Sequence, residues 1–286
     1  MKRRDGHITR SLDERISESC DRLGLFYRTT HRVKSERSME RKKEQKNYVS
    51  DGPQMQDLYG VRVTVFFPDD VHLVTEFLKE RFGSPKDVEI DEVEKDRFCA
   101  RRTNLVFRLP RGLRESASIT EEYSWVDETF EVQVRTILSE GWHEVEHDFR
   151  YKGPDIWSDF SDENRIFNGV LATLETAEWS ILKILEELCY GCYKDQNWAD
   201  MFSLKLRLRI EKQNLDPEIC SVLDDDNKCA KRLYKLERSD ILHALWNMEY
   251  NMPLRLNNIV HYINWEFVEN ESIRDLCPPF LKSKFS

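Results

Sequence analysis

Three long polar side chains alternate with apolar ones in the segment TFEVQVRT, which runs from Thr129 to Thr136. Successive residues of a β-strand point to opposite faces, so Glu131, Gln133 and Arg135 share one face of this strand. Such a row on a largely buried strand is costly unless it meets a ligand, a metal ion or compensating charges. The alternative is the solvated face of an antiparallel sheet. The row is therefore a candidate site face.

A second polar pair lies at the start of another predicted strand, LYGVRVTVFF at Leu58–Phe67, which is rich in β-branched and aromatic residues. Asp57 precedes this strand and Arg62 lies within it. Asp57 and Glu131 can share one Mg²⁺ ion, which typically binds one or two protein carboxylates together with phosphate oxygens. An aspartate at a strand entrance is also ordinary turn chemistry. The block alone leaves both interpretations open.

Basic and hydroxyl side chains crowd the segment HRVKSERSMERKKEQK. We expect residues 9–46 to be helical, which puts Arg32, Lys34, Ser38 and Lys42 within three turns. Lys34 and Ser38, and Ser38 and Lys42, are then four residues apart and share a face. Ammonium groups with a hydroxyl donor between them suit a polyphosphate. An ordinary solvated basic helix face is the alternative.

The remaining pattern supplies the elements that must position these residues. A helix is expected after Pro68, closed by Gly83, and a strand at Thr103–Leu109. From Ile137 onward the chain reads as almost wholly helical, with further helices near 197–212, 238–249 and 255–266. The segment Arg165–Leu188 is predicted to be a core-facing helix, because apolar residues recur at helical spacing. These residues are Ile166, Val170, Leu174, Ile181, Leu185 and Leu188.

These elements predict an α/β (α+β) fold with a mixed sheet of about five strands flanked by helices. We expect a catalytic core at residues 1–155, including the N-terminal helices. Residues 156–286 are expected to form a helical C-terminal region packing on that core. The length of 286 residues suits one large domain or a domain with an appendage.

Composition narrows the class of protein. No apolar run approaches the ~20 residues that span a bilayer, and the basic N-terminus lacks the apolar segment of a secretory signal. Seven cysteines without a regular framework indicate a reduced, cytoplasmic chain. The net charge of -9 conceals 14 Lys/Arg against 8 Asp/Glu in residues 1–48. A uniformly basic nucleic-acid binder is disfavoured, whereas a local anion site near the N-terminus is allowed.

Taken together, the polar blocks resemble the RelA/SpoT-type alarmone synthetases. The blocks are RVKSERSMERK at Arg32–Lys42, DLYGVRV at Asp57–Val63, FEVQVRT at Phe130–Thr136, and the pattern of Trp142, Glu146, His147, Tyr151 and Lys152. They are similar to the family elements R-x-K-x-x-x-S-x-x-x-K, D-L-x-G-x-R, E-x-Q-I-R-T and W-x-x-x-E-H-x-x-x-Y-K. Because four blocks occur in the family's order, the resemblance is specific. It implies a nucleotidyltransferase-like synthetase fold.

The resemblance implies a pyrophosphokinase of the stringent response. Such an enzyme transfers pyrophosphate from ATP to the 3′-hydroxyl of an acceptor nucleotide, GDP or GTP, and releases AMP. By resemblance, Arg32 and Arg62 sandwich the adenine, a role that planar guanidinium groups suit. The ATP phosphates are then held by Lys34, Ser38 and Lys42.

The same resemblance assigns the metal and the proton transfer. Asp57 and Glu131 are expected to bind Mg²⁺, with Glu131 also placed to draw a proton from the attacking hydroxyl. Four further positions that match the family blocks are expected to line or support the site. They are Gln133, Arg135, His147 and Lys152. In phosphoryl-type transfer the protein mainly positions groups and neutralises charge, which agrees with the residue types found here.

The acceptor side departs from the family. The family's G-Y-R-S-L-H loop, whose Tyr stacks on guanine, corresponds to DRFCARRTNLVFRLP at Asp96–Pro110. The expected Tyr falls near Ala100 and the expected His at Asn104, so neither is kept. The candidate acceptor-side residues are instead Phe98, Arg101, Arg102, Asn104 and Lys152. Their arginines suit a phosphate backbone.

Several interpretations of the acceptor follow. The acceptor is a guanine nucleotide, an adenine nucleotide or the 3′ end of a tRNA, as in toxic small synthetases; otherwise the domain is a non-catalytic nucleotide sensor. Retention of the donor and metal residues favours an active enzyme. The expected partners are ATP and the acceptor, with no membrane; a homo-oligomer and a neutralising antitoxin are further options.

Two short motifs are typical of other enzyme classes. The segment His143–His147 reads H-E-x-x-H, the zinc metalloprotease signature. The dipeptide His147-Asp148 resembles that of alarmone hydrolases, but the residues before Arg32 leave no room for the other metal ligands of such a domain. We favour the synthetase interpretation because one block accounts for the same residues.

Overall fold

The computed structural model describes residues 5–90, 103–118, 122–151, 156–157, 159–210 and 214–285. The chain divides into two compact units. The first unit comprises Met1–Ser19 and Tyr27–Trp179, and the second comprises Cys20–Phe26 and Ser180–Ser286. No described helix is long and apolar enough to cross a bilayer.

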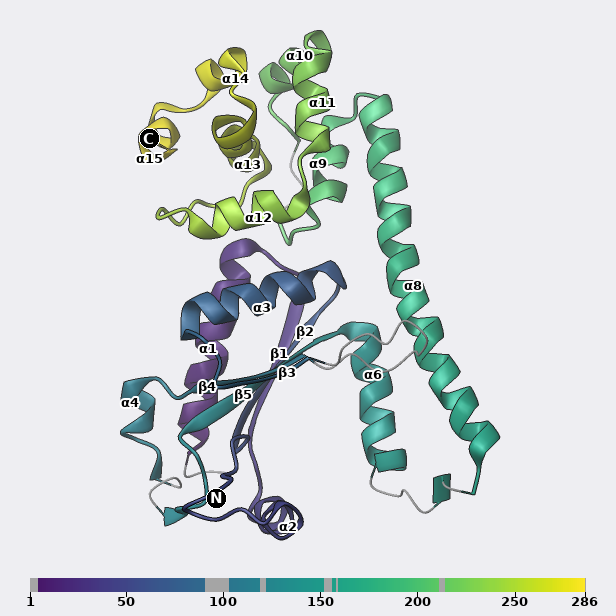
Figure 1. Cartoon of the computed structure of the whole chain (residues 1–286). Coiled ribbons are helices and arrows are strands. Elements are labelled where there is room, and N and C mark those ends of the chain that lie inside the picture. Colours follow the sequence, from purple (N-terminus) through teal and green to yellow (C-terminus); the bar gives the residue numbers. More distant parts are fainter. Residues whose placement is uncertain are drawn as a thin grey trace. The chain divides into compact units, whose positions relative to one another are not determined.

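A five-stranded mixed sheet organises the first unit (Figure 1). Its order is β1-β2-β5-β4-β3, and only β2 and β5 pair in parallel. The strands are β1 (Tyr27–Val33), β2 (Tyr59–Val65), β3 (Asp87–Ile90), β4 (Thr103–Arg108) and β5 (Thr129–Thr136). The predicted fold class and the three strands named from the sequence are confirmed.

Strand β1 corrects the expectation of continuous helix over residues 9–46. The described helices there are α1 (Gly6–Leu23) and α2 (Glu36–Lys46), and the YRTTHRV segment between them pairs with β2 from Tyr27 to Val33. Thr29, Thr30 and Val33 are β-branched, which favours a strand. Arg32 therefore lies on a strand and Lys34 in the following link, so neither shares a helix face with Ser38.

The sheet has one apolar face. Phe82, from α3 (Asp69–Phe82), packs against Phe107 of β4 and Phe130 of β5 with ring centroids 5.6 and 5.2 Å apart. Tyr59 of β2 donates a hydrogen bond of 2.6 Å to Asp5 just before α1. The chain at the start of α1 and helix α3 thus both contact this face. The alternation of side chains along β5 places Glu131 and Gln133 on the other face.

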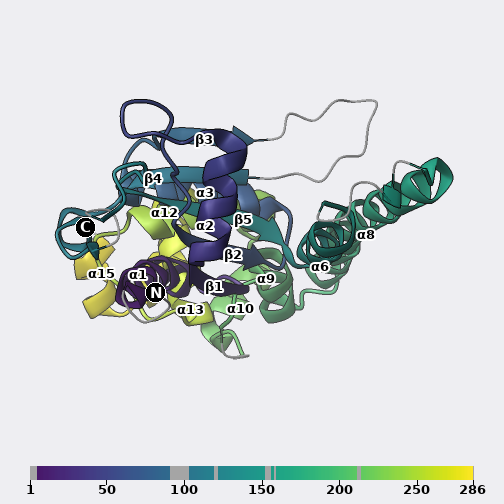
Figure 2. The ribbon, with the colours of Figure 1, turned by 90° about the horizontal axis from the view of Figure 1, so that it is seen from below.

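Helix α2 lies at the sheet edge where β1 ends and β2 begins, as Figures 1 and 2 show. Its position follows from the antiparallel pairing, because only the Lys34-Ser35 link separates β1 from α2. Short helix α4 (Arg111–Arg114) follows β4. The basic residues of α2 are thereby held close to the entrance of β2.

Helix α6 (Ile137–Val145) continues directly from β5 and is capped by the Thr136 side chain, which accepts a hydrogen bond from the Ser139 N–H. It passes into a π-helical turn, η1 (Glu146–Tyr151). Trp142 of α6 stacks on Phe167 at 5.1 Å and donates to its carbonyl oxygen at 3.2 Å. These contacts join α6 to the helix that carries Phe167.

The long helix α8 (Ser161–Lys194) is confirmed, but its predicted core face is wrong. Ile166 and Val170 are 69% and 47% exposed, and Ile181 and Leu188 are also exposed. The buried positions are Leu171, Glu178, Leu182 and Cys189. Leu171, Leu182 and Cys189 each lie one residue beyond an exposed predicted position, so the helix is turned by ~100° from the predicted orientation.

The second unit is helical. Its helices after α8 are α9 (Trp198–Leu206), α10 (Pro217–Asp225), α11 (Asn227–Lys235), α12 (Arg238–Asn247), α13 (Leu256–Ile263), η2 (Asn264–Val268), α14 (Glu271–Leu276) and α15 (Pro279–Phe285). The segment that ends α1 joins this unit through Gly24, whose carbonyl accepts from the Arg209 N–H at 2.6 Å. Gly24 has φ +67°, and a Cβ there would meet Leu254 at 2.9 Å, so this turn requires glycine.

Candidate active site

Asp57 is the centre of a charged cluster at the entrance of β2. Its Oδ2 accepts hydrogen bonds from Lys34 Nζ at 2.5 Å and Lys42 Nζ at 2.6 Å. All three side chains are largely buried. One lysine comes from the link after β1 and the other from α2, so three elements meet here. Two ammonium groups on one carboxylate leave a net positive charge, which suits a phosphate group.

The pKa values in this cluster follow from burial and mutual charge. Burial opposes ionisation of Asp57, but Lys34 and Lys42 outweigh it and lower its pKa. Burial lowers the pKa of Lys34 despite Asp57, whereas Asp57 outweighs burial at Lys42 and raises its pKa. The Asp57 carboxylate is therefore held in its ionised form, which can bind a cation.

Glu131 lies on the polar face next to this cluster. Its Oε2 accepts a hydrogen bond of 2.8 Å from Gln133 Nε2. Burial first, and then the negative charge of Asp57, raises the pKa of Glu131. A carboxylate with raised proton affinity is a suitable general base, because its pKa lies closer to neutral pH.

A hydrogen-bonded chain runs from Glu131 to α6. Arg62 Nε donates to Gln133 Oε1 at 3.2 Å, so the Gln133 amide links Arg62 to Glu131. Arg62 Nη1 also donates to Glu140 and Glu144 of α6. The Glu144 and Glu140 contacts outweigh burial and raise the pKa of Arg62. Arg62 is thus oriented by the sheet on one side and the helix on the other.

Arg135 is turned toward the same helix. Its Nη1 donates to Glu140 Oε2 at 3.1 Å, and its side chain is 9% exposed. It shares Glu140 with Arg62. Arg135 therefore supports the helix that orients Arg62.

The strand register aligns the predicted residues in two rows. Arg32 of β1 lies opposite Gly60 of β2, which lies opposite Glu131 of β5. In the next row, Arg62 lies opposite Gln133, which lies opposite the buried Asn104 of β4. The nearest atoms to a Cβ built on Gly60 would be Arg32 O and Cγ, at 3.9 and 4.0 Å. Gly60 leaves space between the two flanking side chains.

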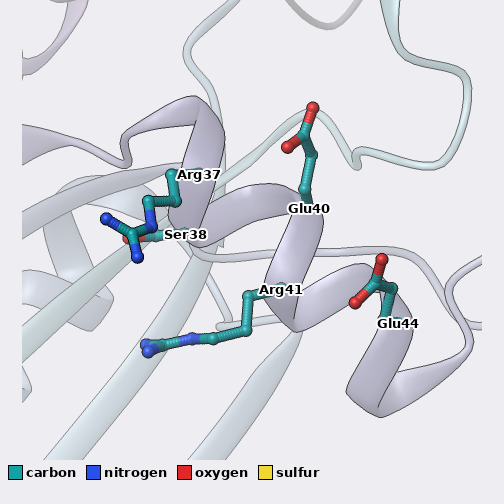
Figure 3. A pocket seen from close by; sticks show the side chains of 5 residues that line it. All are labelled: Arg37, Ser38, Glu40, Arg41 and Glu44. Atoms are coloured by element: carbon teal, nitrogen blue, oxygen red, sulfur yellow. The ribbon is translucent and has the colours of Figure 1, made fainter.

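A shallow cavity of about 530 Å³ lies along α2. It is lined by Arg37, Ser38, Glu40, Arg41 and Glu44. In Figure 3, Arg37, Arg41 and Ser38 point to one side of α2, and Glu40 and Glu44 point to the other. Ser38 Oγ accepts a hydrogen bond of 2.9 Å from Ser35 Oγ. The predicted phosphate residues thus line two adjoining places, Ser38 at the cavity and both lysines at Asp57.

The remaining predicted residues are placed as follows. His147 lies on η1, is half exposed and is 3.0 Å from Asp148, and its charge reaches Glu144. His143 is buried and packs on the Trp142 ring at 5.5 Å. Tyr48 follows α2 and lies close enough to Lys42 and Asp57 for their charges to act on it. The predicted residues Phe98, Arg101, Arg102 and Lys152 lie outside the described residues.

Three contributors were missed from the sequence, namely Glu140, Glu144 and Tyr48. The two glutamates are four residues apart on a helix that follows a strand with a polar row, and this spacing was a usable signal. Tyr48 had none, because only the fold brings it to Asp57.

The donor set fits Mg²⁺. Asp57 Oδ1 is buried and has no hydrogen-bond partner among the described residues, while Glu131 lies close enough for the two charges to repel. No group of three or more His, Cys, Asp or Glu side chains in the described part of the chain is arranged to hold a metal. Mg²⁺ suits two carboxylates, because it keeps waters and takes phosphate oxygens as its other ligands.

The fold and the site together bring acidic and basic side chains to the polar face of a five-stranded mixed sheet. Residues 31–155 match the family model described as the region found in RelA / SpoT proteins. This match covers the part of the chain that carries the four sequence blocks, so the predicted resemblance is confirmed. No curated protein sequence matches the chain.

Solved structures of similar chains include small alarmone synthetases. Synthetase 2 from Bacillus subtilis is 23% identical and covers 64% of this chain and 95% of its own, with TM-score 0.46. Synthetase 1 from the same organism, bound to its product pppGpp, is 18% identical and covers 64% and 94%, with TM-score 0.48. A GTP pyrophosphokinase family protein from Streptococcus pneumoniae is 20% identical and covers 69% and 91%, with TM-score 0.45.

Proposed function

We propose that this protein is an Mg²⁺-dependent enzyme that transfers the pyrophosphate of ATP to the 3′-hydroxyl of a guanine nucleotide and releases AMP. The observation that carries the proposal is the Asp57 cluster, in which two lysines and a neighbouring Glu131 converge on one face of the RelA/SpoT region. The cluster offers positive charge for phosphates and a base for the hydroxyl.

The proposed reaction balances as one displacement. The 3′-oxygen of the acceptor forms a bond to the β-phosphorus of ATP, and the bond from that phosphorus to the oxygen bridging to the α-phosphorus breaks. Glu131 accepts the proton of the hydroxyl, and AMP leaves with the electron pair. Lys34 and Lys42 neutralise the phosphate charge, which is the main task of a protein in such transfers.

Asp57 and Glu131 would hold Mg²⁺, which supplies Lewis-acid stabilisation of the phosphate oxygens. Gln133 keeps the Glu131 carboxylate oriented through its 2.8 Å hydrogen bond. Arg62, fixed by Gln133 and α6, presents a planar guanidinium group suited to stacking on the adenine.

A second acceptor deserves a direct comparison. The segment Asp96–Pro110 lacks the family's guanine-stacking Tyr and carries arginines instead. Arginines suit a polynucleotide backbone, so the 3′ end of a tRNA is the alternative acceptor. An adenine nucleotide is the third, and Asn104, which replaces the family's His, borders the site in each case.

The test follows a label through the reaction. The purified chain is incubated with Mg²⁺ and β-labelled ATP, and GDP, GTP, ATP or bulk tRNA is offered in turn. We expect label on a guanine nucleotide with one AMP per transfer, and no transfer after chelation of Mg²⁺. Label on RNA or on ATP instead would identify tRNA or an adenine nucleotide as the acceptor, and the reaction would still be pyrophosphate transfer. If ATP binds but no acceptor leads to AMP, the proposed enzymatic activity is refuted, and the domain is a nucleotide sensor.

A further inference from the structure

Three tyrosines form a stack at the surface of the second unit. Tyr190 and Tyr193, from the last turns of α8, lie with ring centroids 6.3 Å apart and planes at 25°. Tyr193 stacks on Tyr234 of α11 at 4.6 Å and 22°. Lys205 Nζ lies 5.6 Å from the Tyr234 centroid. Tyr190 is 51% exposed, so the stack ends in an open aromatic ring.

A basic stripe runs along α11. Lys228, Lys231, Arg232 and Lys235 are all exposed, and their spacing of three, four and seven residues places them on one face. The opposite face, which includes Leu233, is buried. None of the three lysines has a carboxylate within ion-pair distance among the described residues. The lysines of the stripe therefore make no close ion pair in the described part of the chain, and Asp224, Asp225 and Asp226 precede them directly before α11.

The stack borders the stripe. Tyr234 lies three residues beyond Lys231 and directly before Lys235. Tyr193 donates a hydrogen bond of 3.1 Å to Asn227 Oδ1, and Asn227 lies one turn before Lys231. Exposed Lys194 follows Tyr193 at the end of α8. Flat rings and lysines are thus presented side by side.

We propose that the α11 stripe and the tyrosine stack form a binding surface for single-stranded nucleic acid. Exposed rings stack on unpaired bases, and neighbouring lysines contact the phosphates. Unpaired bases are required, because a duplex hides its base faces while offering the same phosphates. An acidic protein would use the lysines but has no need of the open Tyr190 ring. This surface belongs to the second unit, and the proposal does not depend on the proposed reaction.

A carboxylate beside the tyrosine stack opposes the binding of such a ligand. Glu186 of α8 is exposed, and its charge reaches Tyr234. A phosphate bound beside Tyr234 would be repelled by it. Removing this charge is therefore expected to strengthen binding, which provides a variant that gains rather than loses affinity.

The experiment measures fluorescence anisotropy of a labelled twelve-nucleotide oligouridylate with the full chain, without ATP, over a range of salt concentrations. We expect Tyr190→Ala to weaken binding about tenfold with an unchanged salt dependence. Lys231→Ala should lower the slope of log affinity against log salt by about 0.7, the value for one single-strand phosphate. Glu186→Gln should tighten binding several-fold. Lys79→Ala, which removes the same charge from an exposed position of α3, is the matched control and should have no effect.

Circular dichroism melts check that each surface variant is folded. The proposal is overturned if the oligonucleotide does not bind, if a DNA duplex of equal length binds as tightly, or if Tyr190→Ala has no effect. Loss on Lys231→Ala with a silent Tyr190→Ala would mark the stripe as a surface for polyanions or acidic proteins instead. Equal loss with Lys79→Ala would show that only net charge matters.

Discussion

At the scale of single residues, burial and neighbouring charges together set the pKa values of the two carboxylates in the site. Asp57 stays ionised because two lysines surround one of its oxygens. Glu131 has no such cations at hydrogen-bond distance among its described contacts, and burial together with Asp57 raises its pKa. The pKa values of two carboxylates on one face are therefore shifted in opposite directions, a pattern typical of sites in which one carboxylate stays ionised and the other exchanges a proton.

Glu131→Gln tests the proposed base. The amide keeps the shape and can still accept the hydrogen bond from Gln133, but it cannot take a proton. We expect transfer to fall by at least about 10²-fold, the usual contribution of general base catalysis, while ATP affinity changes only a few-fold. Label transfer and calorimetric ATP binding measure the two quantities. A fully active variant would remove Glu131 from the site.

The same substitution has a consequence for stability. Because the folded-state pKa of Glu131 is raised, its ionisation destabilises the fold as the pH rises above the unfolded-state pKa, and the loss is complete above the folded-state pKa. Glu131→Gln should therefore raise the melting temperature at neutral pH. The gain should shrink as the pH falls and vanish below the pKa of an unfolded glutamate, about 4.3. Melting curves across that range are the measurement, and a loss of stability at neutral pH would contradict the cause assigned to the pKa shift.

At the scale of elements, the sheet register decides which side chains meet. The alternation in FEVQVRT was enough to place Glu131 and Gln133 on one face. The strand β1 could not be recognised in the same way, because its lysine- and arginine-rich neighbours favour helix locally and its threonines are stabilised by pairing with β2. Lys34 reaches Asp57 from a strand end and Lys42 from a helix, and a continuous helix would not have brought both to one oxygen.

Gly60→Val tests the row formed by Arg32, Gly60 and Glu131. The fold has room for the new Cβ, because no atom lies within 3.9 Å of it, and valine favours a strand. We expect an unchanged or higher melting temperature but at least about tenfold weaker transfer, since the side chain fills the space for the substrate. Thr64→Val, on the same strand and face, is the control and should stay active. Full activity of Gly60→Val would mean that the substrate does not enter this row.

The α6 glutamates provide a matched pair. Glu140 bonds to Arg62 and Arg135 and is 17% exposed, whereas Glu144 bonds to Arg62 and is 58% exposed. Glu140→Gln leaves two buried guanidinium groups poorly paired and should cost about 1–3 kcal/mol of unfolding free energy. Glu144→Gln should cost less than about 1 kcal/mol, as for exposed ion pairs. Urea denaturation compares them, and equal losses would contradict the assigned roles.

At the scale of the whole molecule, the sequence predicted the first unit far better than the second. Motif blocks constrain strands and site residues between Arg32 and Tyr151, and the fold class is confirmed there. In the part of α8 that belongs to the second unit, periodicity identified the helix but not its buried face, since exposed Ile181 is as apolar as the buried Leu182. The tyrosine stack had no sequence signal, because Tyr234 is distant in the chain from Tyr190 and Tyr193.

The central claim concerns the whole enzyme: the transferred group is a pyrophosphate and its destination is a 3′-hydroxyl. The direct measurement is phosphorus NMR of the chain with Mg²⁺, ATP and GDP. The proposed reaction predicts AMP and, in equal amount, a new diphosphate attached at the 3′ position, and neither in the Glu131→Gln variant. Formation of ADP would mean single phosphoryl transfer, and formation of free pyrophosphate would mean hydrolysis. Either result would contradict pyrophosphate transfer at the Asp57 cluster.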